Sequence, residues 1–387
     1  MQDLFFQYID THRDQMLSLW KDLVNQDSQA SDREGVAHVA RRLMSELSNA
    51  GAQVSWNKKG NALVAYIPGN EEAPVFLLGH MDTVFPKGEA AKRPFTICEG
   101  KAYGPGVLDM KGGLTVLVSA LQGLKEIGFQ GRPVKIVLAA DEETAHAGSA
   151  AASLITEEAR GAVAAFNCET SYEDDSLVLG RKGGVVFKFA VHGVAAHAGN
   201  NPKDGKNAIW AMARKIDAIE QLTDWEKGIT YSVDVIHGGT VSNAIPDYCE
   251  AEGDIRFLDP AVASSVKERF LSVLEKDNMD GTHAELLTYH EGMIPMKMTE
   301  ENQKLFTFVK KVGEEVGILI SQGKLVGGGS DSGYVVAAGV PTVCAMGVKG
   351  KYNHTEREYA LVDSLFERTK LLGAVLMALA EDGWGNA

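Results

Sequence analysis

The sequence predicts an α/β protein with a mostly parallel sheet, into which a smaller ferredoxin-like α+β domain is inserted. Three observations support this fold class. Strand-like apolar runs alternate with helical patterns over residues 54 to about 179, which is typical of βαβ units and a parallel sheet. A different cycle of elements occupies residues 183–292. The chain of 387 residues also exceeds the roughly 250–300 residues that one hydrophobic core usually supports, so two domains are expected.

The first part of the chain is expected to begin with helices. Residues 3–50 have the pattern of two amphipathic helices, and Gly51 caps the second of them, over residues 33–50, at its C-terminus. In the alternating segment that follows, an apolar helix over residues 110–123 lies between a strand ending near His80 and a strand over residues 135–140. This order suits parallel strands, because each needs a crossover connection to the next.

The middle of the chain has its own order of elements. We expect a strand, a helix, two strands, a helix and a strand, over residues 185–192, 205–222, 231–236, 248–257, 260–276 and 283–290. This β-α-β-β-α-β order matches the ferredoxin-like split motif. After about Met293 the chain returns to helices, strands and glycine-rich loops. The predicted domains are therefore residues 1–182 together with 293–387, and residues 183–292 as the insertion.

Residue types that bind metal ions stand where apolar strands give way to loops or helices. They are His80, Asp109, Glu143, Glu169 and His354. In an open α/β sheet, parallel strands end at one edge, and ligands bind at that edge. Two imidazoles and three carboxylates gathered there match the ligands of a pair of hydrolytic zinc ions. His354 follows the insertion, so the last segment must rejoin the first domain if the five residues are to meet.

Two further acids beside these ligands are candidates for chemistry. Asp82 shares a face with His80 in an extended chain and could accept the second N–H of its imidazole. Glu142 and Glu143 are adjacent and point apart, so one could bind metal while the other handles protons. Structural alternatives stay open for each motif alone: a surface His–Asp pair, a helix-capping Asp109, or an exposed helix N-terminus at the two glutamates.

The remaining candidates lie in the inserted domain. His197 opens a loop ahead of the helix that begins near residue 205. Asn243, within the segment 239–246, and Arg256 could recognise the carboxylate of a substrate. A strand-end turn and a surface arginine explain these two residues equally well.

Composition limits the classes of partner. The net charge of −14 offers no basic stripe for phosphates, which argues against nucleic acid. The N-terminus lacks the pattern of a signal peptide, and no run approaches the roughly 20 apolar residues of a membrane span. We therefore expect a cytoplasmic protein with no membrane contact. The four cysteines form no Cys-x-x-Cys pair, so we expect buried, reduced thiols, including Cys168 beside Glu169.

Taken together, the motifs resemble the dizinc peptidase family of glutamate carboxypeptidase (carboxypeptidase G), aminoacylase and succinyl-diaminopimelate desuccinylase. The resemblance covers nearly the whole chain and rests on residues 79–84, 104–113, 141–143, 169, 197–199, 241–246, 328–331 and 354. It implies a zinc-peptidase catalytic domain with an inserted lid and dimerisation domain.

The resemblance also implies a role for each metal-ligand residue. Asp109 would bridge two zinc ions, with cobalt or manganese as substitutes. The other ligands would divide into two pairs, His80 with Glu169 and Glu143 with His354.

Roles for the remaining residues follow from the same resemblance. Glu142 would be the general base that later protonates the leaving amine, and Asp82 would orient His80. The inserted domain would form a homodimer, in which His197 reaches the active site of the partner subunit. Asn243 and Arg256 would contact the carboxylate end of the substrate.

The expected reaction is hydrolysis of an amide or peptide bond next to a free carboxylate, in a short peptide or an N-acyl amino acid. A deacylase or desuccinylase acting on a metabolic intermediate is the alternative. A scaffold used for binding alone is a third class, but none of the expected ligands is missing. Met293 stands where the glutamate-preferring relatives carry an arginine, which weakens the prediction of a glutamate-type substrate.

Overall fold

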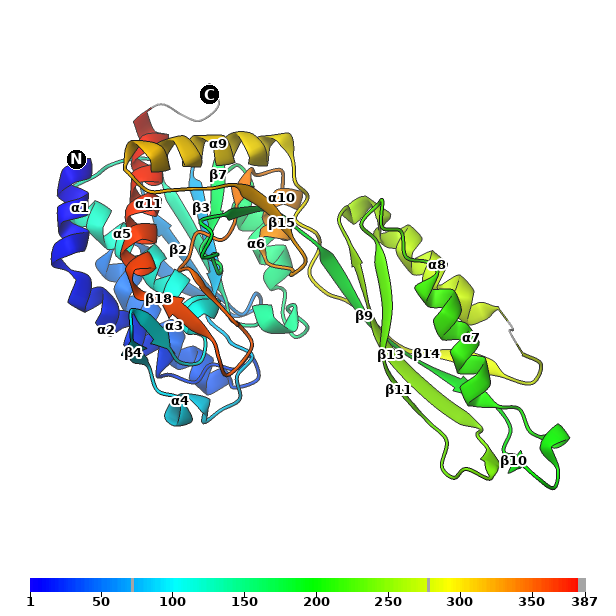
Figure 1. Cartoon of the computed structure of the whole chain (residues 1–387). Helices are drawn as coiled ribbons and strands as arrows, with labels where there is room; N and C mark the ends of the chain where they lie inside the picture. The colour runs from blue at the N-terminus through cyan, green and yellow to red at the C-terminus, as the bar shows by residue number, and fades with distance from the viewer. Residues whose placement is uncertain (71–72, 277–278, 382–387) are drawn as a thin grey trace. The chain divides into compact units, whose positions relative to one another are not determined.

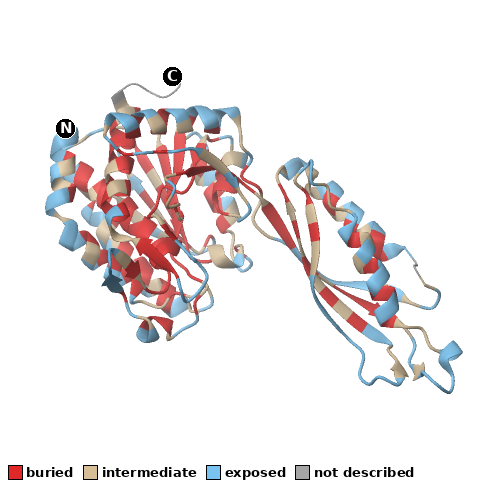
Figure 2. Cartoon of the chain, viewed as in Figure 1, coloured by how far each residue is buried: buried red, intermediate tan, exposed pale blue. Residues whose placement is uncertain are grey.

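The computed structural model describes residues 1–70, 73–276 and 279–381, and the chain divides into two compact units (Figure 1). The first unit consists of Met1–Leu179, Met298–Leu325 and Tyr334–Ala387. The second consists of Gly180–Lys297 and Val326–Gly333. Figure 2 shows that buried residues gather within each unit, as expected for two separate hydrophobic cores.

A six-stranded sheet forms the centre of the first unit. In spatial order its strands are β1 (Gln53–Asn57), β2 (Ala62–Ile67), β6 (Val134–Ala139), β3 (Val75–His80), β7 (Ala164–Asn167) and β16 (Thr342–Val343). The pairings β6–β3, β3–β7 and β7–β16 are parallel, whereas β1–β2 and β2–β6 are antiparallel. The predicted α/β class with a mostly parallel sheet is confirmed. Strands β3 and β6 therefore end side by side, at His80 and Ala139.

Helices pack around this sheet and build the larger core. They are α1 (Gln2–Thr11), α2 (Arg13–Val24), α3 (Arg33–Asn49), α4 (Glu89–Lys92), α5 (Gly112–Glu126), α6 (Ala151–Ala159), α9 (Glu300–Glu315), α10 (Ser332–Ala337) and α11 (Val362–Glu381). Helix α5 lies against α1, α2, α3 and α11. Gly51 ends α3 with a positive φ of 88°, as expected of a C-terminal cap.

The N-terminal region has three helices where two were expected. Helices α1 and α2 are separated at His12, whose φ of −109° and ψ of 17° are not helical. The Thr11 hydroxyl donates to the carbonyl of Gln7, and the His12 ring lies 2.8 Å from the carbonyl of Tyr8. Such side-chain bonds to the preceding turn compete with continuation of the helix.

A small sheet joins distant parts of the first unit. Its order is β17 (Gly350–Lys351), β18 (Tyr359–Leu361), β5 (Lys101–Tyr103) and β4 (Thr96–Cys98). The pairing of β18 with β5 brings the segment after His354 beside the loop that leads to Asp109. Strands β8 (Leu177–Arg181) and β15 (Gly323–Val326) form a separate two-stranded ribbon.

The second unit has the β-α-β-β-α-β order that the sequence predicts. Its elements are β9 (Gly183–His192), α7 (Ala208–Glu220), β11 (Thr230–Gly238), β13 (Tyr248–Phe257), α8 (Ala263–Glu275) and β14 (His283–Glu291). The strands form an antiparallel sheet in the order β11-β13-β9-β14. Helix α7 starts at Ala208, later than expected, because the Asn207 side chain caps it by accepting from the amide of Trp210. The ferredoxin-like insertion is confirmed.

One stretch of the first unit contradicts the expectation that no segment is long and apolar enough to cross a membrane. Residues Val107–Glu126 meet that test by length and composition. However, 94% of the apolar window is buried inside the protein, as in the core helix of a folded domain.

Candidate metal centre

Asp109 lies at the centre of the site and presents its two carboxylate oxygens to different imidazoles. It belongs to the short helical turn η1 (Val107–Lys111), but its own φ of −114° and ψ of 98° are not helical. Its Oδ1 lies 3.2 Å from Nε2 of His80, and its Oδ2 lies 3.1 Å from Nε2 of His354. Asn353 also donates to Oδ2, at 3.0 Å. No side chain caps α5, so Asp109 does not act as the helix cap that was one alternative.

His80 ends strand β3 and is buried. Its Nδ1 lies 3.0 Å from the carbonyl oxygen of Asp82, which can only accept, so this nitrogen carries the proton of the neutral ring. Nε2 then keeps its lone pair for the site. Glu169 Oε1 lies 3.8 Å and Glu142 Oε2 lies 3.9 Å from that Nε2.

Asp82 is fully buried and connects two strand ends. One of its carboxylate oxygens lies 3.4 Å from Nδ1 of His80. The two oxygens also accept from the backbone amides of Glu142 and Glu143, at 3.2 and 3.0 Å. The sequence predicts that Asp82 lies beside His80, but no local pattern indicates its contact with Glu142 and Glu143. That contact depends on the parallel pairing of β3 with β6.

Glu143 faces the outer part of the site. Its Oε2 lies 3.2 Å from Nε2 of His354, and its Oε1 is buried without a hydrogen-bond partner. A buried carboxylate oxygen that lacks a donor is suited to a cation. His354 itself is the most exposed of these side chains, at 50%.

Glu169 follows β7 and is buried, as is Cys168 before it. Burial raises the pKa of the Cys168 thiol far above its usual value, so this cysteine is a core thiol, as expected.

Three groups of side chains in the described part of the chain come close enough to hold an ion. They are His80 with Asp109 and Glu169, Asp109 with Glu143 and His354, and His80 with Glu142 and Glu143. In each group the ligand atoms lie within 4.8 Å of one another. The first two groups share Asp109.

The pKa shifts in the site show that its carboxylates stabilise positive charge on their neighbours. The hydrogen bonds that His354 donates to the carboxylates of Asp109 and Glu143 raise its pKa to about 11. Burial lowers the pKa of His80, but Glu142, Asp109 and Asp82 outweigh it and raise this pKa well above its usual value. Burial also opposes ionisation of Asp109, yet the two histidines hold its pKa well below the usual range. Protons on the imidazoles therefore supply positive charge that cations could supply instead.

Glu358 is a buried neighbour of the site to which sequence reasoning assigned no role. Its carboxylate accepts from the amides of Gly106, Leu108 and Asp109, at 3.0, 2.8 and 2.9 Å. Burial raises its pKa to about 7, against the lowering effect of these bonds. Its position four residues after His354 was visible in the sequence, but nothing there indicated a partner 249 residues away.

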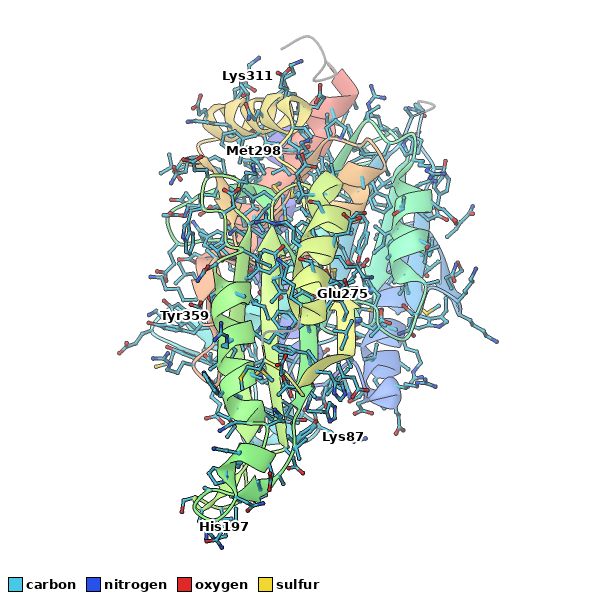
Figure 3. All side chains as sticks on the ribbon, turned by 90° about the vertical axis from the view of Figure 1, so that its right-hand side faces the viewer. Lys87, His197, Glu275, Met298, Lys311 and Tyr359 are labelled. Carbon is cyan, nitrogen blue, oxygen red and sulfur yellow. The ribbon has the colours of Figure 1, made fainter. Side chains whose placement is uncertain are left out.

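The other candidates belong to the second unit. His197 lies in β10 (Ala196–His197), beyond the N-terminal end of α7 (Figure 3), and is exposed. This strand pairs with β12 (Ala244–Ile245), and the carbonyl of Asn243 accepts from the amide of Ala198. His197 and Asn243 are thus on one ribbon. Arg256 is near the far end of β13, where its Nε lies 2.6 Å from Asp254.

Known proteins similar to this chain in sequence and in structure include peptidases. Residues 76–378 match the model of peptidase family M20/M25/M40. The chain is 28% identical over 385 residues to carboxypeptidase G2 of Pseudomonas sp. (strain RS-16), covering 97% of this chain and 92% of that protein.

Solved structures show the same fold. One is a tripeptidase from Staphylococcus aureus, with a TM-score of 0.82, 22% identity and coverage of 96% of this chain and 99% of that one. Another is a Bacillus subtilis protein described as a dinuclear metal-binding peptidase, with a TM-score of 0.69, 15% identity and coverage of 96% and 99%.

Proposed function

Because the chain belongs to peptidase family M20/M25/M40, and its hydrolases are metal-dependent, we propose that it hydrolyses an amide or peptide bond next to a free carboxylate. The substrate is a short peptide or an N-acyl amino acid. The observation that carries the proposal is the Asp109 carboxylate, whose two oxygens face His80 and His354 separately. That arrangement suits a ligand shared by two cations.

The donor set fits a pair of divalent cations. His80, Asp109 and Glu169 would hold one, and Asp109, Glu143 and His354 would hold the other. The unpartnered Oε1 of Glu143 supports this assignment. Nitrogen and carboxylate ligands suit zinc, with cobalt or manganese as substitutes. When bound, such cations polarise the scissile carbonyl and acidify water.

Glu142 is the acid left over for proton transfer. In this assignment it binds no cation, and its side chain is about 10% exposed. It takes a proton from the attacking water and later gives it to the leaving amine, as a general base and acid. Asp82 holds the backbone of Glu142 and Glu143, which keeps the ligand and the base apart.

The second unit recognises the substrate and joins two subunits in this proposal. Asn243 and Arg256 bind the carboxylate end of the substrate. His197 completes the active site of the partner in a homodimer and helps to stabilise the oxyanion of the tetrahedral intermediate.

The proposal is tested first by separating turnover from metal binding. Glu142→Gln should lower kcat by roughly 10²–10⁴-fold while both metals remain bound, because the base is lost and the ligands are kept. Glu157→Gln, an exposed acid on α6, is the matched control and should be unchanged. Retained turnover in Glu142→Gln would remove this residue from its role.

The substrate class is tested with matched pairs of compounds. Dipeptides, tripeptides and N-acyl amino acids should be hydrolysed. The rate of hydrolysis of each compound should fall when its C-terminal carboxylate is amidated. Preference for N-acyl amino acids over all peptides would favour the alternative, a deacylase. Equal hydrolysis of the amidated compounds would contradict the proposed recognition of a free carboxylate.

A further inference from the structure

Glu358 is a fully buried carboxylate outside the proposed ligand set, and it contacts the loop that carries Asp109. It receives three backbone N–H groups, from Gly106, Leu108 and Asp109, at 2.8–3.0 Å. Successive amides that converge on one anion form a concave binding site of the kind that holds charged groups tightly. Here the anion is supplied by the chain itself.

The Asp109 loop depends on such outside support. Gly106 has a φ of 72°, and the backbone of Asp109 and Met110 departs from helical geometry. The loop therefore lacks a regular hydrogen-bond ladder of its own at this point. The indole of Trp20 donates to the carbonyl of Val107, so side chains hold both the amide side and the carbonyl side of the loop.

A buried lysine, Lys111, interacts electrostatically with Glu358. The Lys111 side chain is buried, and its Nζ donates to the carbonyl of Gln26 at 2.6 Å. Burial lowers the pKa of Lys111 to about 7, and the charge of Glu358 opposes this lowering. A buried carboxylate without a compensating charge would be costly. The three backbone N–H groups, with a smaller electrostatic contribution from Lys111, therefore stabilise Glu358 in the interior as an acceptor.

Glu358 is tied to the His354 segment by the chain itself. It precedes β18, which pairs with β5 next to the Asp109 loop. Residues 351–357 are all exposed, and His354 has a positive φ of 63°. Turn hydrogen bonds within the segment and a bond from Arg93 to the carbonyl of Glu356 hold its backbone. The segment contacts the site through His354, which faces Asp109 and Glu143, and Glu358 fixes the point where the segment enters β18.

We propose that Glu358 is a positioning residue of the metal centre, which fixes the shared carboxylate of Asp109 against His354. It would thereby shape the outer cation site, formed by Asp109, Glu143 and His354. The inference rests on the dinuclear site proposed above. It predicts a selective effect. The outer site depends on the His354 segment. The inner site, formed by His80, Asp109 and Glu169, should be affected much less, because His80 and Glu169 are held at strand ends.

Zinc binding to the metal-free full-length chain tests the proposal. Wild type should bind two equivalents. Glu358→Gln should keep one equivalent at wild-type affinity and bind the second roughly 10–100-fold more weakly, the effect usual for residues that support metal ligands. Glu356→Gln, an exposed acid in the same segment, should bind both equivalents as wild type does.

Three outcomes would overturn the inference. Unchanged affinity for both equivalents would show that Glu358 does not position the site. Equal weakening of both, with a matching loss of thermal stability in the metal-free chain, would show a general structural role. A wild-type chain that binds fewer than two equivalents would overturn the dinuclear site itself.

A second variant covers the case in which Glu358→Gln does not fold. Glu358→Asp keeps the charge but is one methylene too short to reach all three amides. It should show the same selective loss at the second equivalent, and equal binding of both equivalents would contradict the proposal.

Discussion

At the residue scale, two carboxylates organise the centre because their oxygens serve different partners. Asp109 faces His80 with one oxygen and His354 with the other. Asp82 accepts from the amides of Glu142 and Glu143 while facing His80. Each residue thus connects segments that are far apart in the sequence. Substitution at either position should disturb several groups at once.

Asp82→Asn tests this double contact. The asparagine oxygen can accept one of the two amides, but its NH2 group faces the other amide donor, and the charge beside His80 is lost. Zinc affinity should fall roughly 10–100-fold. The free energy of unfolding of the metal-free protein should fall by about 1–3 kcal/mol. Metal competition and chemical denaturation measure the two effects.

Asp14→Asn, on the exposed face of α2, is the control for Asp82→Asn. An equal change in both variants would contradict the double contact of Asp82.

The affinity for zinc should rise with pH. In the metal-free chain the pKa of His354 is raised to about 11 and that of His80 lies well above its usual value. A cation must displace these protons, so its binding becomes easier as pH rises.

The stability of the metal-free protein should change with pH in the opposite direction to its zinc affinity. A histidine with a raised folded pKa stabilises the metal-free fold fully below about pH 6.5, and this contribution is lost as pH rises towards 11. Zinc titrations and thermal unfolding between pH 6 and 9 measure both trends. A zinc affinity independent of pH would contradict the assignment of the two histidines as ligands.

At the element scale, the position of α5 depends on glycines that allow close approach. A Cβ atom on Gly113 would lie 1.7 Å from the carbonyl oxygen of Cys168, directly before Glu169. One on Gly347 would lie 2.3 Å from the same oxygen. The start of α5, the end of β7 and the segment after β16 therefore meet where only hydrogen fits. Gly113 is therefore needed for the close packing of α5 against the end of β7.

Gly113→Ala should accordingly destabilise the protein. Alanine usually favours a helix over glycine by about 1 kcal/mol. Here the added methyl must push α5 from Cys168, and such overpacking costs about 1–3 kcal/mol or more. We expect a net loss in the free energy of unfolding, measured by urea denaturation, and weaker zinc binding as Glu169 moves. Gly148→Ala, where the methyl meets no atom within 4 Å, is the control. A stabilised Gly113→Ala variant would contradict the close packing.

The edge strand β11 is where we expect the second unit to pair with a partner. Val235 and Ile236 are exposed on this strand. Ile209 of α7 packs beside it at Gly238 and Gly239, and its neighbour Trp210 is exposed as well. An open, apolar strand edge is a site for association with another chain.

Ile236→Lys should therefore convert the proposed homodimer into a monomer, measured by sedimentation. It should also lower kcat, because His197 would no longer reach a partner. Leu287→Lys, on the opposite edge strand β14, is a matched control and should stay dimeric. A dimeric Ile236→Lys variant with full activity would contradict the proposed interface.

At the scale of the whole molecule, the sequence predicts the secondary-structure elements and candidate ligands better than the long-range contacts between them. The α/β class and the ferredoxin-like insertion follow from the periodicity and order of elements. The candidate ligands could be chosen because parallel strands end at one edge, and the structure brings all five of them, with Glu142 and Asp82, into one unit. Their division into ligands and base stays a prediction.

What the sequence did not predict depends on long-range contacts. The contact of Asp82 with the acid pair spans 60 residues, and that of Glu358 with Asp109 spans 249. Neither has a local pattern. The break between α1 and α2 was missed for a different reason, since His12 fits a helical pattern and side-chain bonds to the backbone interrupt it.

The central claim is that Asp109 is shared by two cations, one held with His80 and Glu169 and the other with Glu143 and His354. Anomalous diffraction at the zinc absorption edge, from crystals of the zinc-loaded protein, tests it most directly. The account predicts two zinc peaks, one on each side of the Asp109 carboxylate and each beside its own pair of ligands. A single peak, or two peaks that do not share Asp109, would contradict it.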